Sequence, residues 1–255
     1  MKPGGVTRVS TELLPYQELD PNNPGYDPWT WFNVVGAVGC ALWIVAYLLI
    51  YTKARRDRTY GLPLLAICLN FSWEFLAVFV WPNPVALWRW FDRLWLGFDL
   101  LLVWQLLTSG RREMLIPEVR RFFFPMLAML TAGAIALEHT FVMTYFDRLG
   151  LVAAFSINLV MSALFIPFFF ARRSDLRGLS LPAAWCKMLG TLGTAIECHV
   201  VVRLIDPELP TLAFLSASCA CIFLLDCIYI ALLTFVGGAR ADLLADDRAV
   251  LGGAG

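Results

Sequence analysis

The chain has 255 residues, of which 59% are hydrophobic and 16% are charged, whereas a soluble domain carries roughly 25% charged residues. Its 20 lysines and arginines balance 20 aspartates and glutamates, so it lacks the positive excess with which proteins bind nucleic acid. These values exclude a soluble globular domain. They leave the lipid bilayer as the expected environment, with no nucleic-acid partner.

Seven stretches of the chain are apolar and long enough to cross a bilayer, for which a helix needs about 20 residues. They predict an all-α integral membrane protein with seven transmembrane helices, at Trp31–Thr52, Leu62–Trp81, Leu94–Leu107, Phe122–Tyr145, Leu151–Ala171, Ala183–Ile205 and Leu212–Val236. The third stretch is short and is counted with its flanks, 92–108. We expect a polar extracytoplasmic segment 1–28 without a signal peptide, a seven-helix domain 29–237 and a disordered cytoplasmic tail 238–255.

The positive charges indicate how these helices are oriented. The segments after the first, third and fifth helices and the C-terminal tail together hold 13 basic residues, and the opposite side holds five. By the positive-inside rule the N-terminus then lies outside and the C-terminus in the cytoplasm. In a bacterium the membrane would be the plasma membrane.

Two of the arginine-rich segments, 54–63 and 171–182, look like copies of one another, because both run from Ala-Arg-Arg through Gly-Leu to a proline. Each is followed by a helix with a glutamate and then by a helix with an aspartate, namely Glu74 and Asp99 in one half and Glu197 and Asp226 in the other. This order favours a parallel repeat of three helices on either side of a linker helix. Loop topology and helix-start chemistry could also produce such similarity.

Several ionisable side chains fall inside the predicted membrane helices, where each costs at least about 2.5 kcal/mol and is a functional-site hypothesis. They are Glu74, Asp99, Glu138, His139, Glu197, His199 and Asp226. For Asp99, Glu138 and Glu197 the alternative is a neutral hydrogen-bonded strut between helices. No HxxxH or ExxH spacing occurs and the seven cysteines form no CxxC pair, so we expect no metal site.

Glu74 and Asp226 are the strongest candidates. Asn70 lies one helical turn before Glu74 on the same face, so the two side chains can form a hydrogen bond. Asp226 has Phe223 three residues before it and Tyr229 three after it, which predicts an aromatic collar around a lone carboxyl. A carboxyl alone among apolar groups stays protonated at neutral pH and acts as a stored proton.

The sixth predicted helix, Ala183–Ile205, offers less specific signals. Gly190 and Gly193 share the face of Glu197, and such a stripe of small residues more often marks close helix packing than a site. Lys187 lies near the cytoplasmic entry of this helix, where we expect it to extend its amine to the membrane interface.

Aromatic residues make up 14% of the chain, and many stand beside the acids. An acid can create a carbocation, and aromatic faces attract a positive centre without reacting with it. The residues expected to bind substrate or support the acids are Asn70, Phe71, Trp73, Asp99, Glu138, His139, Glu197, Phe223 and Tyr229.

The segment Asn70-Phe71-Ser72-Trp73-Glu74-Phe75, the later Leu225-Asp226, the seven-helix layout and the length together resemble the integral-membrane terpene cyclases. These enzymes serve fungal meroterpenoid and indole-diterpene pathways, and bacterial relatives make drimane-type indole sesquiterpenoids such as the drimentines. The resemblance implies that Glu74 and Asp226 are the essential acids and that no metal or other cofactor takes part. It implies a proton-initiated cyclisation of a prenyl chain, such as farnesyl, on an indole or other aromatic head, with an isomeric product.

Two other functional hypotheses compete with the terpene cyclase. A small proton-coupled transporter could use the same acids as a proton relay, although the paired proline and glycine helix breaks of such transporters are missing. A membrane prenyltransferase would need aspartate-rich magnesium motifs, and the Asp-Asp pair of the chain lies in its tail, at 246 and 247.

Overall fold

A computed structural model describes residues 29–83, 86–145, 147, 150–205 and 211–252, with the side chains of all these residues except 202–205, 211, 212 and 238–252. The predicted extracytoplasmic segment 1–28 lies outside the described residues. Within the described ranges every regular element is a helix, which confirms the all-α prediction.

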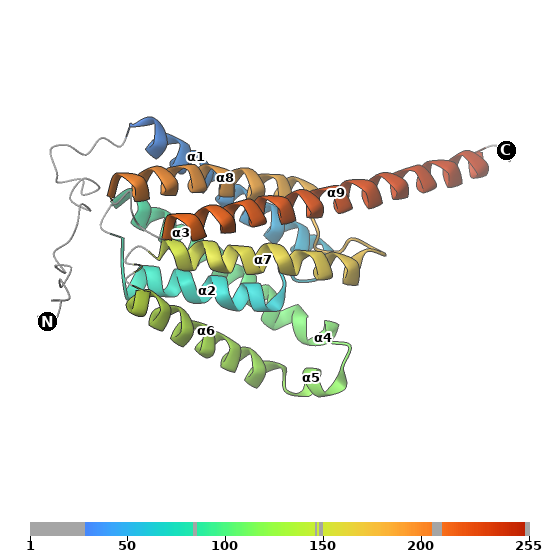
Figure 1. Cartoon of the computed structure of the whole chain (residues 1–255). Coiled ribbons are helices and arrows are strands. Elements are labelled where there is room, and N and C mark those ends of the chain that lie inside the picture. Colours follow the sequence, from blue (N-terminus) through green and yellow to red (C-terminus); the bar gives the residue numbers. More distant parts are fainter. Residues whose placement is uncertain (1–28, 84–85, 146, 148–149, 206–210, 253–255) are drawn as a thin grey trace, which may run out of the picture.

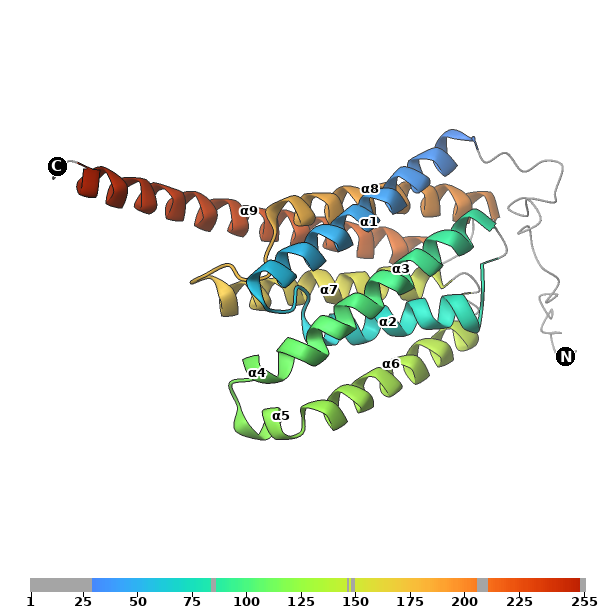
Figure 2. The same ribbon diagram turned by 180° about the vertical axis from the view of Figure 1, so that it is seen from behind.

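Long helices run side by side and form the body of the molecule (Figures 1 and 2). In chain order the elements are α1 (Trp31–Asp57), α2 (Leu64–Phe79), α3 (Ala86–Gln105), the π-helical turn η1 (Leu106–Gly110), α4 (Arg111–Glu113), α5 (Pro117–Arg121), α6 (Phe123–Tyr145), α7 (Leu151–Arg172), α8 (Leu181–Ile205) and α9 (Thr211–Gly252). The short helices α4 and α5 belong to the connection between α3 and α6. Helix α9 continues through 238–252, where we expected a disordered tail.

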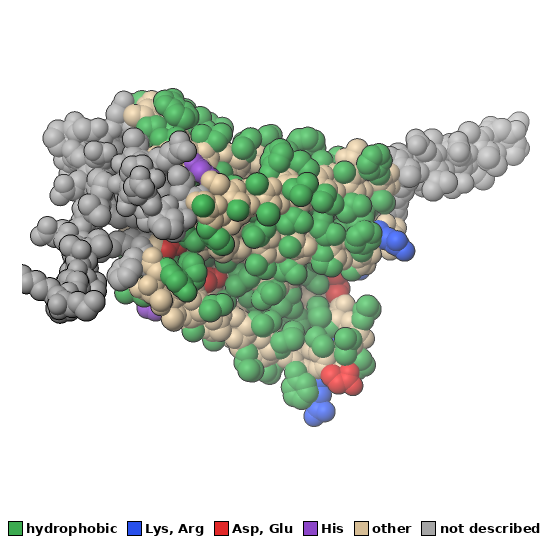
Figure 3. All heavy atoms as spheres, viewed as in Figure 1, with side chains coloured by type: hydrophobic (Ala, Val, Ile, Leu, Met, Phe, Trp, Pro, Cys, Tyr) green, Lys and Arg blue, Asp and Glu red, His purple; other side chains and the backbone are tan. Residues whose placement is uncertain are grey.

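Four helical segments are long and apolar enough to cross a membrane: α1, α6, α7 and the part Ala213–Gly237 of α9. No more than a third of each apolar window is buried inside the protein, and Figure 3 shows hydrophobic side chains over most of the face of the bundle that it displays. Lipid is the solvent that such a surface requires. The four candidate spans therefore support a membrane protein, whereas seven crossings stay a prediction, because α2 is shorter and the charged residues of α3 and α8 lower their hydropathy.

Helix α1 packs most closely on α8, and glycines make the approach possible. A Cβ atom on Gly39 would lie 2.7 Å from the carbonyl oxygen of Gly190, and one on Gly193 would lie 2.9 Å from the Cα of Gly39. Real Cβ atoms essentially never come that close to backbone, so each position requires glycine. The packing role predicted for the stripe of Gly190 and Gly193 is confirmed.

The loops at one end of the bundle are tied together by a clasp built on Arg172 of α7. Its guanidinium donates to the carbonyl oxygen of Tyr60 at 2.6 Å and to the carboxylate of Glu113 at 2.8 Å, and it lies 4.1 Å from the ring centre of Phe168. Burial raises the pKa of the Tyr60 phenol, which therefore stays neutral. Beside it, the N–H of Gly178 donates to Asp57 at 2.8 Å, so the two similar arginine-rich segments contact one another.

Candidate active site

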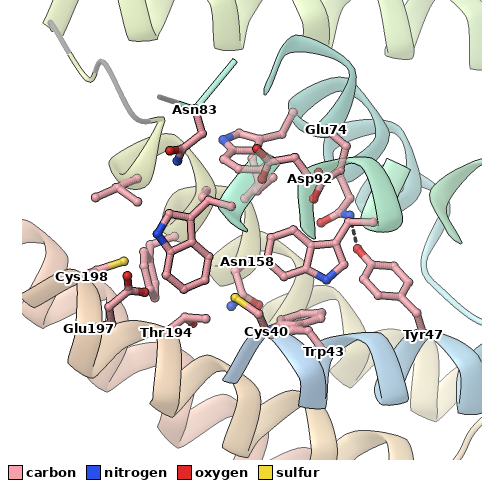
Figure 4. Close-up of a pocket in the computed structure, with 18 of the residues that line it drawn as sticks. Cys40, Trp43, Tyr47, Glu74, Asn83, Asp92, Asn158, Thr194, Glu197 and Cys198 are labelled. Atoms are coloured by element: carbon pink, nitrogen blue, oxygen red, sulfur yellow. Dashed lines mark hydrogen bonds between the residues drawn. The ribbon is translucent and has the colours of Figure 1, made fainter. Parts of the chain in front are cut away.

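A cavity of about 180 Å³ lies at the opposite end of the bundle from the clasp, between α1, α2, α3, α7 and α8 (Figure 4). The residues that line it are Cys40, Trp43, Tyr47, Asn70, Trp73, Glu74, Asn83, Trp88, Asp92, Trp95, Leu151, Ala154, Phe155, Ile157, Asn158, Thr194, Glu197, Cys198 and Val201. The lining combines indole faces with a few carboxyl and amide groups. Such a composition is typical of a pocket for a largely apolar ligand.

Tryptophans from three helices form much of the wall: Trp43 of α1, Trp73 of α2, and Trp88 and Trp95 of α3. The indole of Trp73 is fixed by a 3.0 Å hydrogen bond from its Nε1 to the carbonyl oxygen of Gly150. Gly150 has φ +64°, and a Cβ atom there would lie 2.8 Å from the ring of Trp81. The turn before α7 therefore requires glycine at position 150, so that the indoles of Trp73 and Trp81 can pack against it.

Three carboxyl groups line the cavity, and all are buried: Glu74 of α2, Asp92 of α3 and Glu197 of α8, with 5%, 6% and 9% of their surface exposed. The Oε2 atom of Glu74 has no hydrogen-bond partner among the residues that the structure describes. In Figure 4 Glu74 and Asp92 lie on one side of the cavity and Glu197 lies on the other. A buried carboxyl without a cation is more stable neutral than ionised.

Asn70 does not form the hydrogen bond to Glu74 that we expected. Its Nδ2 donates to both carboxylate oxygens of Asp99, at 3.1 and 2.9 Å, and to the hydroxyl of Tyr47. Asp99 is fully buried behind the cavity wall. This hydrogen-bonded cluster joins α1, α2 and α3, so Asp99 acts as a strut between helices, the alternative that the sequence left open.

Asp226 is not a lone carboxyl, and the prediction for Lys187 was wrong too. The ammonium of Lys187 donates to both oxygens of Asp226 at 2.8 Å and to the hydroxyl of Ser162 at 2.7 Å. Only 2% of Lys187 is exposed, so it is a core residue and not an interface residue. Asp226 is therefore neutralised by a partner 39 positions away in the sequence. It does not line the cavity.

The aromatic collar that the sequence predicts around Asp226 does not form. Phe223 is 46% exposed, so it faces outward. Tyr229 is buried and stacks on Phe165, with ring centres 4.8 Å apart.

Three other expected site residues do not line the cavity either. Glu138 is buried on α6, and neither of its carboxyl oxygens has a partner within the described part of the chain. His139 and Phe71 also lie outside the lining. Among the described residues no group of three or more histidine, cysteine, aspartate or glutamate side chains could hold a metal ion.

Of the expected site residues, Asn70, Trp73, Glu74 and Glu197 line the cavity. Sequence reasoning missed Asp92, because it was counted as a flank of a short helix, and Asn158, a polar residue in an apolar run. The available signal was the one used for the acids, namely a polar group within a predicted span.

Comparison with known proteins agrees with this architecture. The family model described as Pyr4-like transmembrane terpene cyclases matches residues 17–238. Similar proteins include the terpene cyclase spyD of Aspergillus fumigatus, 32% identical over 29% of this chain and 31% of its own length. The terpene cyclase pyr4 of the same species is 29% identical over 38% and 43%, and macJ of Penicillium terrestre is 28% identical over 62% and 63%.

The chain thus spans less than two thirds of each of these relatives. No solved structure matches it. Because the family model covers most of the sequence, from before α1 into α9, the chain belongs to the Pyr4-like transmembrane terpene cyclases.

Proposed function

We propose that this chain is a membrane terpene cyclase that closes a prenyl chain, such as farnesyl, carried on an indole or other aromatic head. Glu74 starts the reaction by giving a proton to the terminal alkene or epoxide oxygen of the chain. The product is a drimane-type or related polycyclic isomer of the substrate. No step of this proposal requires an oxidant, a reductant or a diphosphate leaving group.

The observation that carries the proposal is the setting of Glu74, a buried carboxyl with an unpaired oxygen in a cavity walled by tryptophans. Among the residues that the structure describes, no lysine or arginine lines this cavity to hold the carboxyl in its ionised form. The four indoles offer faces to a carbocation without acting as bases. An acid and a cation-stabilising wall are the two parts that this chemistry needs.

The proton and electron balance is simple. The neutral carboxyl of Glu74 protonates one end of the polyene, and the π electrons of successive double bonds form the new carbon–carbon bonds. The last carbocation loses a proton either to water, in which case Glu74 regains one from water, or to the Glu74 carboxylate itself. The carboxylate left behind needs stabilisation in the transition state. We assign that to Asp92, which lies on the same side of the cavity (Figure 4) and can donate a hydrogen bond when it is protonated.

Asp226 has a different proposed role. Its partner Lys187 lies 5.5 Å from the ring centre of Trp43, which lines the cavity. We assign to Asp226 and Lys187 the positioning of this wall, since Asp226 itself does not contact the cavity.

The proposed internal repeat is supported by pairs of helix contacts. Helix α1 packs on α8 as α7 packs on α2, and α2 packs on α3 as α8 packs on α9. Glu74 and Glu197 occupy related helices, and both line the cavity. A parallel repeat with N-terminus outside and C-terminus in the cytoplasm is the topology we propose.

The test is a reaction in heavy water. Membranes that contain the protein are incubated with farnesylated indoles, with and without a terminal epoxide, and isomers are sought by chromatography and mass spectrometry. Direct alkene protonation places one non-exchangeable deuterium in the product, whereas protonation of an epoxide oxygen places none on carbon.

The matched control for the acid is Glu138, which is as buried as Glu74 and has no partner on either carboxyl oxygen among the described residues, but lies outside the cavity. Glu74→Gln should abolish product formation and Glu138→Gln should retain it. Full activity in Glu74→Gln would overturn the assignment of the acid. No isomer from any prenylated substrate would overturn the cyclase and favour a proton-coupled transporter.

A further inference from the structure

We infer that the cavity recognises the head of the substrate through the side-chain oxygen of Asn158, so that the head must carry an N–H or O–H donor. The inference rests on the proposed cyclase, because it names the class of head group that the same cavity accepts. It concerns the wall formed by α7 and α8.

The side chain of Asn158 offers a buried hydrogen-bond acceptor in the cavity lining. The residue is 9% exposed, and its Nδ2 donates to the hydroxyl of Thr191 on α8 at 3.1 Å. That bond orients the amide and leaves Oδ1 buried, with no partner among the described residues. A buried acceptor without a donor is unfavourable, so a ligand that supplies the donor is bound more tightly than one that does not.

The described neighbours of Asn158 on α7 and α8 do not supply this donor. Thr194 also lines the cavity, but its hydroxyl donates to the carbonyl oxygens of Gly190 and Thr191 of its own helix, at 3.2 and 3.1 Å. The remaining lining residues of α7 are Leu151, Ala154, Phe155 and Ile157, which are apolar. Since none of the residues that the structure describes donates to this oxygen, we assign the donor to the ligand.

The position of Asn158 also orients the substrate. In Figure 4 Asn158 lies near the middle of the view, below Glu74 and Asp92. With the head held at Asn158, the prenyl chain extends along the tryptophans toward Glu74. The reactive end of the chain then meets the proposed acid, and the head stays away from it.

The experiment compares a farnesylated indole that has a free N–H with its N-methyl counterpart. The wild-type protein should show a KM that is roughly fivefold to a hundredfold higher for the N-methyl compound, which is the range for an unpaired buried acceptor. In Asn158→Leu this ratio should fall toward one, because no acceptor remains. Ser156→Ala is the control, since Ser156 also lies on α7 but bonds only to Val152 and is not in the lining.

A binding arm separates the inference from the proposed activity. Analogues with a saturated chain cannot cyclise, and their binding is followed by quenching of the fluorescence of the cavity tryptophans. A preference for the N–H analogue that Asn158→Leu removes supports the inference, even where no cyclised product forms. Equal binding of the two analogues by the wild-type protein, or a preference that persists in Asn158→Leu, overturns it.

Discussion

The ammonium of Lys187 lies 2.8 Å from each carboxylate oxygen of Asp226 and 5.5 Å from the ring centre of Trp43. An ion pair that joins α8 to α9 thus stands directly behind an aromatic wall contributed by α1. Both charges are buried, so each depends on the other for its neutralisation. A change in either residue should therefore reach the cavity.

Removing one partner of this pair should be more harmful than removing both. Lys187→Met or Asp226→Leu alone leaves a buried charge unpaired and should lower the free energy of unfolding by about 3 to 5 kcal/mol. The double variant leaves no charge and should recover much of that loss. Unfolding in detergent measures the three variants, and equal losses in all of them would contradict the pairing.

The wall tryptophans should matter for turnover. Trp43→Leu removes an aromatic face from the cavity and should lower kcat roughly twofold to thirtyfold, the range that corresponds to about 0.5 to 2 kcal/mol of cation–π stabilisation. Trp90→Leu is the control, because Trp90 lies on α3 but is 62% exposed and outside the lining. Steady-state rates that fall equally in both variants would refute a role specific to the cavity.

The contact between α1 and α8 should tolerate no side chain at Gly39. Gly39→Ala brings a methyl group against the backbone of α8 and should lower the free energy of unfolding by about 1 to 3 kcal/mol, as overpacking does. Gly97→Ala has open space around the new methyl and should be neutral or stabilising by up to about 1 kcal/mol, because alanine favours a helix. Thermal unfolding of the two variants distinguishes these outcomes.

The clasp should depend on the shape of the guanidinium as well as on its charge. Arg172→Lys keeps the charge but loses the forked donors and the stacking on Phe168, so we expect a loss of about 1 to 2 kcal/mol in the free energy of unfolding. Arg173→Lys changes an exposed neighbour and should have little effect. A matched loss at both positions in denaturation experiments would mean that only charge matters at this end of the bundle.

The sequence predicts well what depends on local pattern. Apolar runs located the helices, small residues at helical spacing predicted close helix packing at Gly190 and Gly193, and the cost of a charge in lipid singled out Glu74 as a candidate. Each of these inferences needs only one helix and its known periodicity. None requires knowledge of which helix lies next to it.

What could not be predicted depends on pairing between distant segments. Lys187 and Asp226 are 39 positions apart, and nothing in either helix indicates that the two side chains meet. Asn70 was expected to bond within its own helix, but the fold supplies Asp99 and Tyr47 from other helices. The cavity lining likewise depends on the order in which the helices pack, which local periodicity does not encode.

The clasp also restrains one end of the helix bundle. Arg172, Tyr60, Asp57 and Gly178 bind the loops of both halves to one another, whereas the cavity lies toward the other ends of the same helices. Because these hydrogen bonds hold the two halves together at one end, we expect the helices to separate more easily at the cavity end. In the proposed cyclase, we expect substrate and product to exchange at that end, beside the cavity.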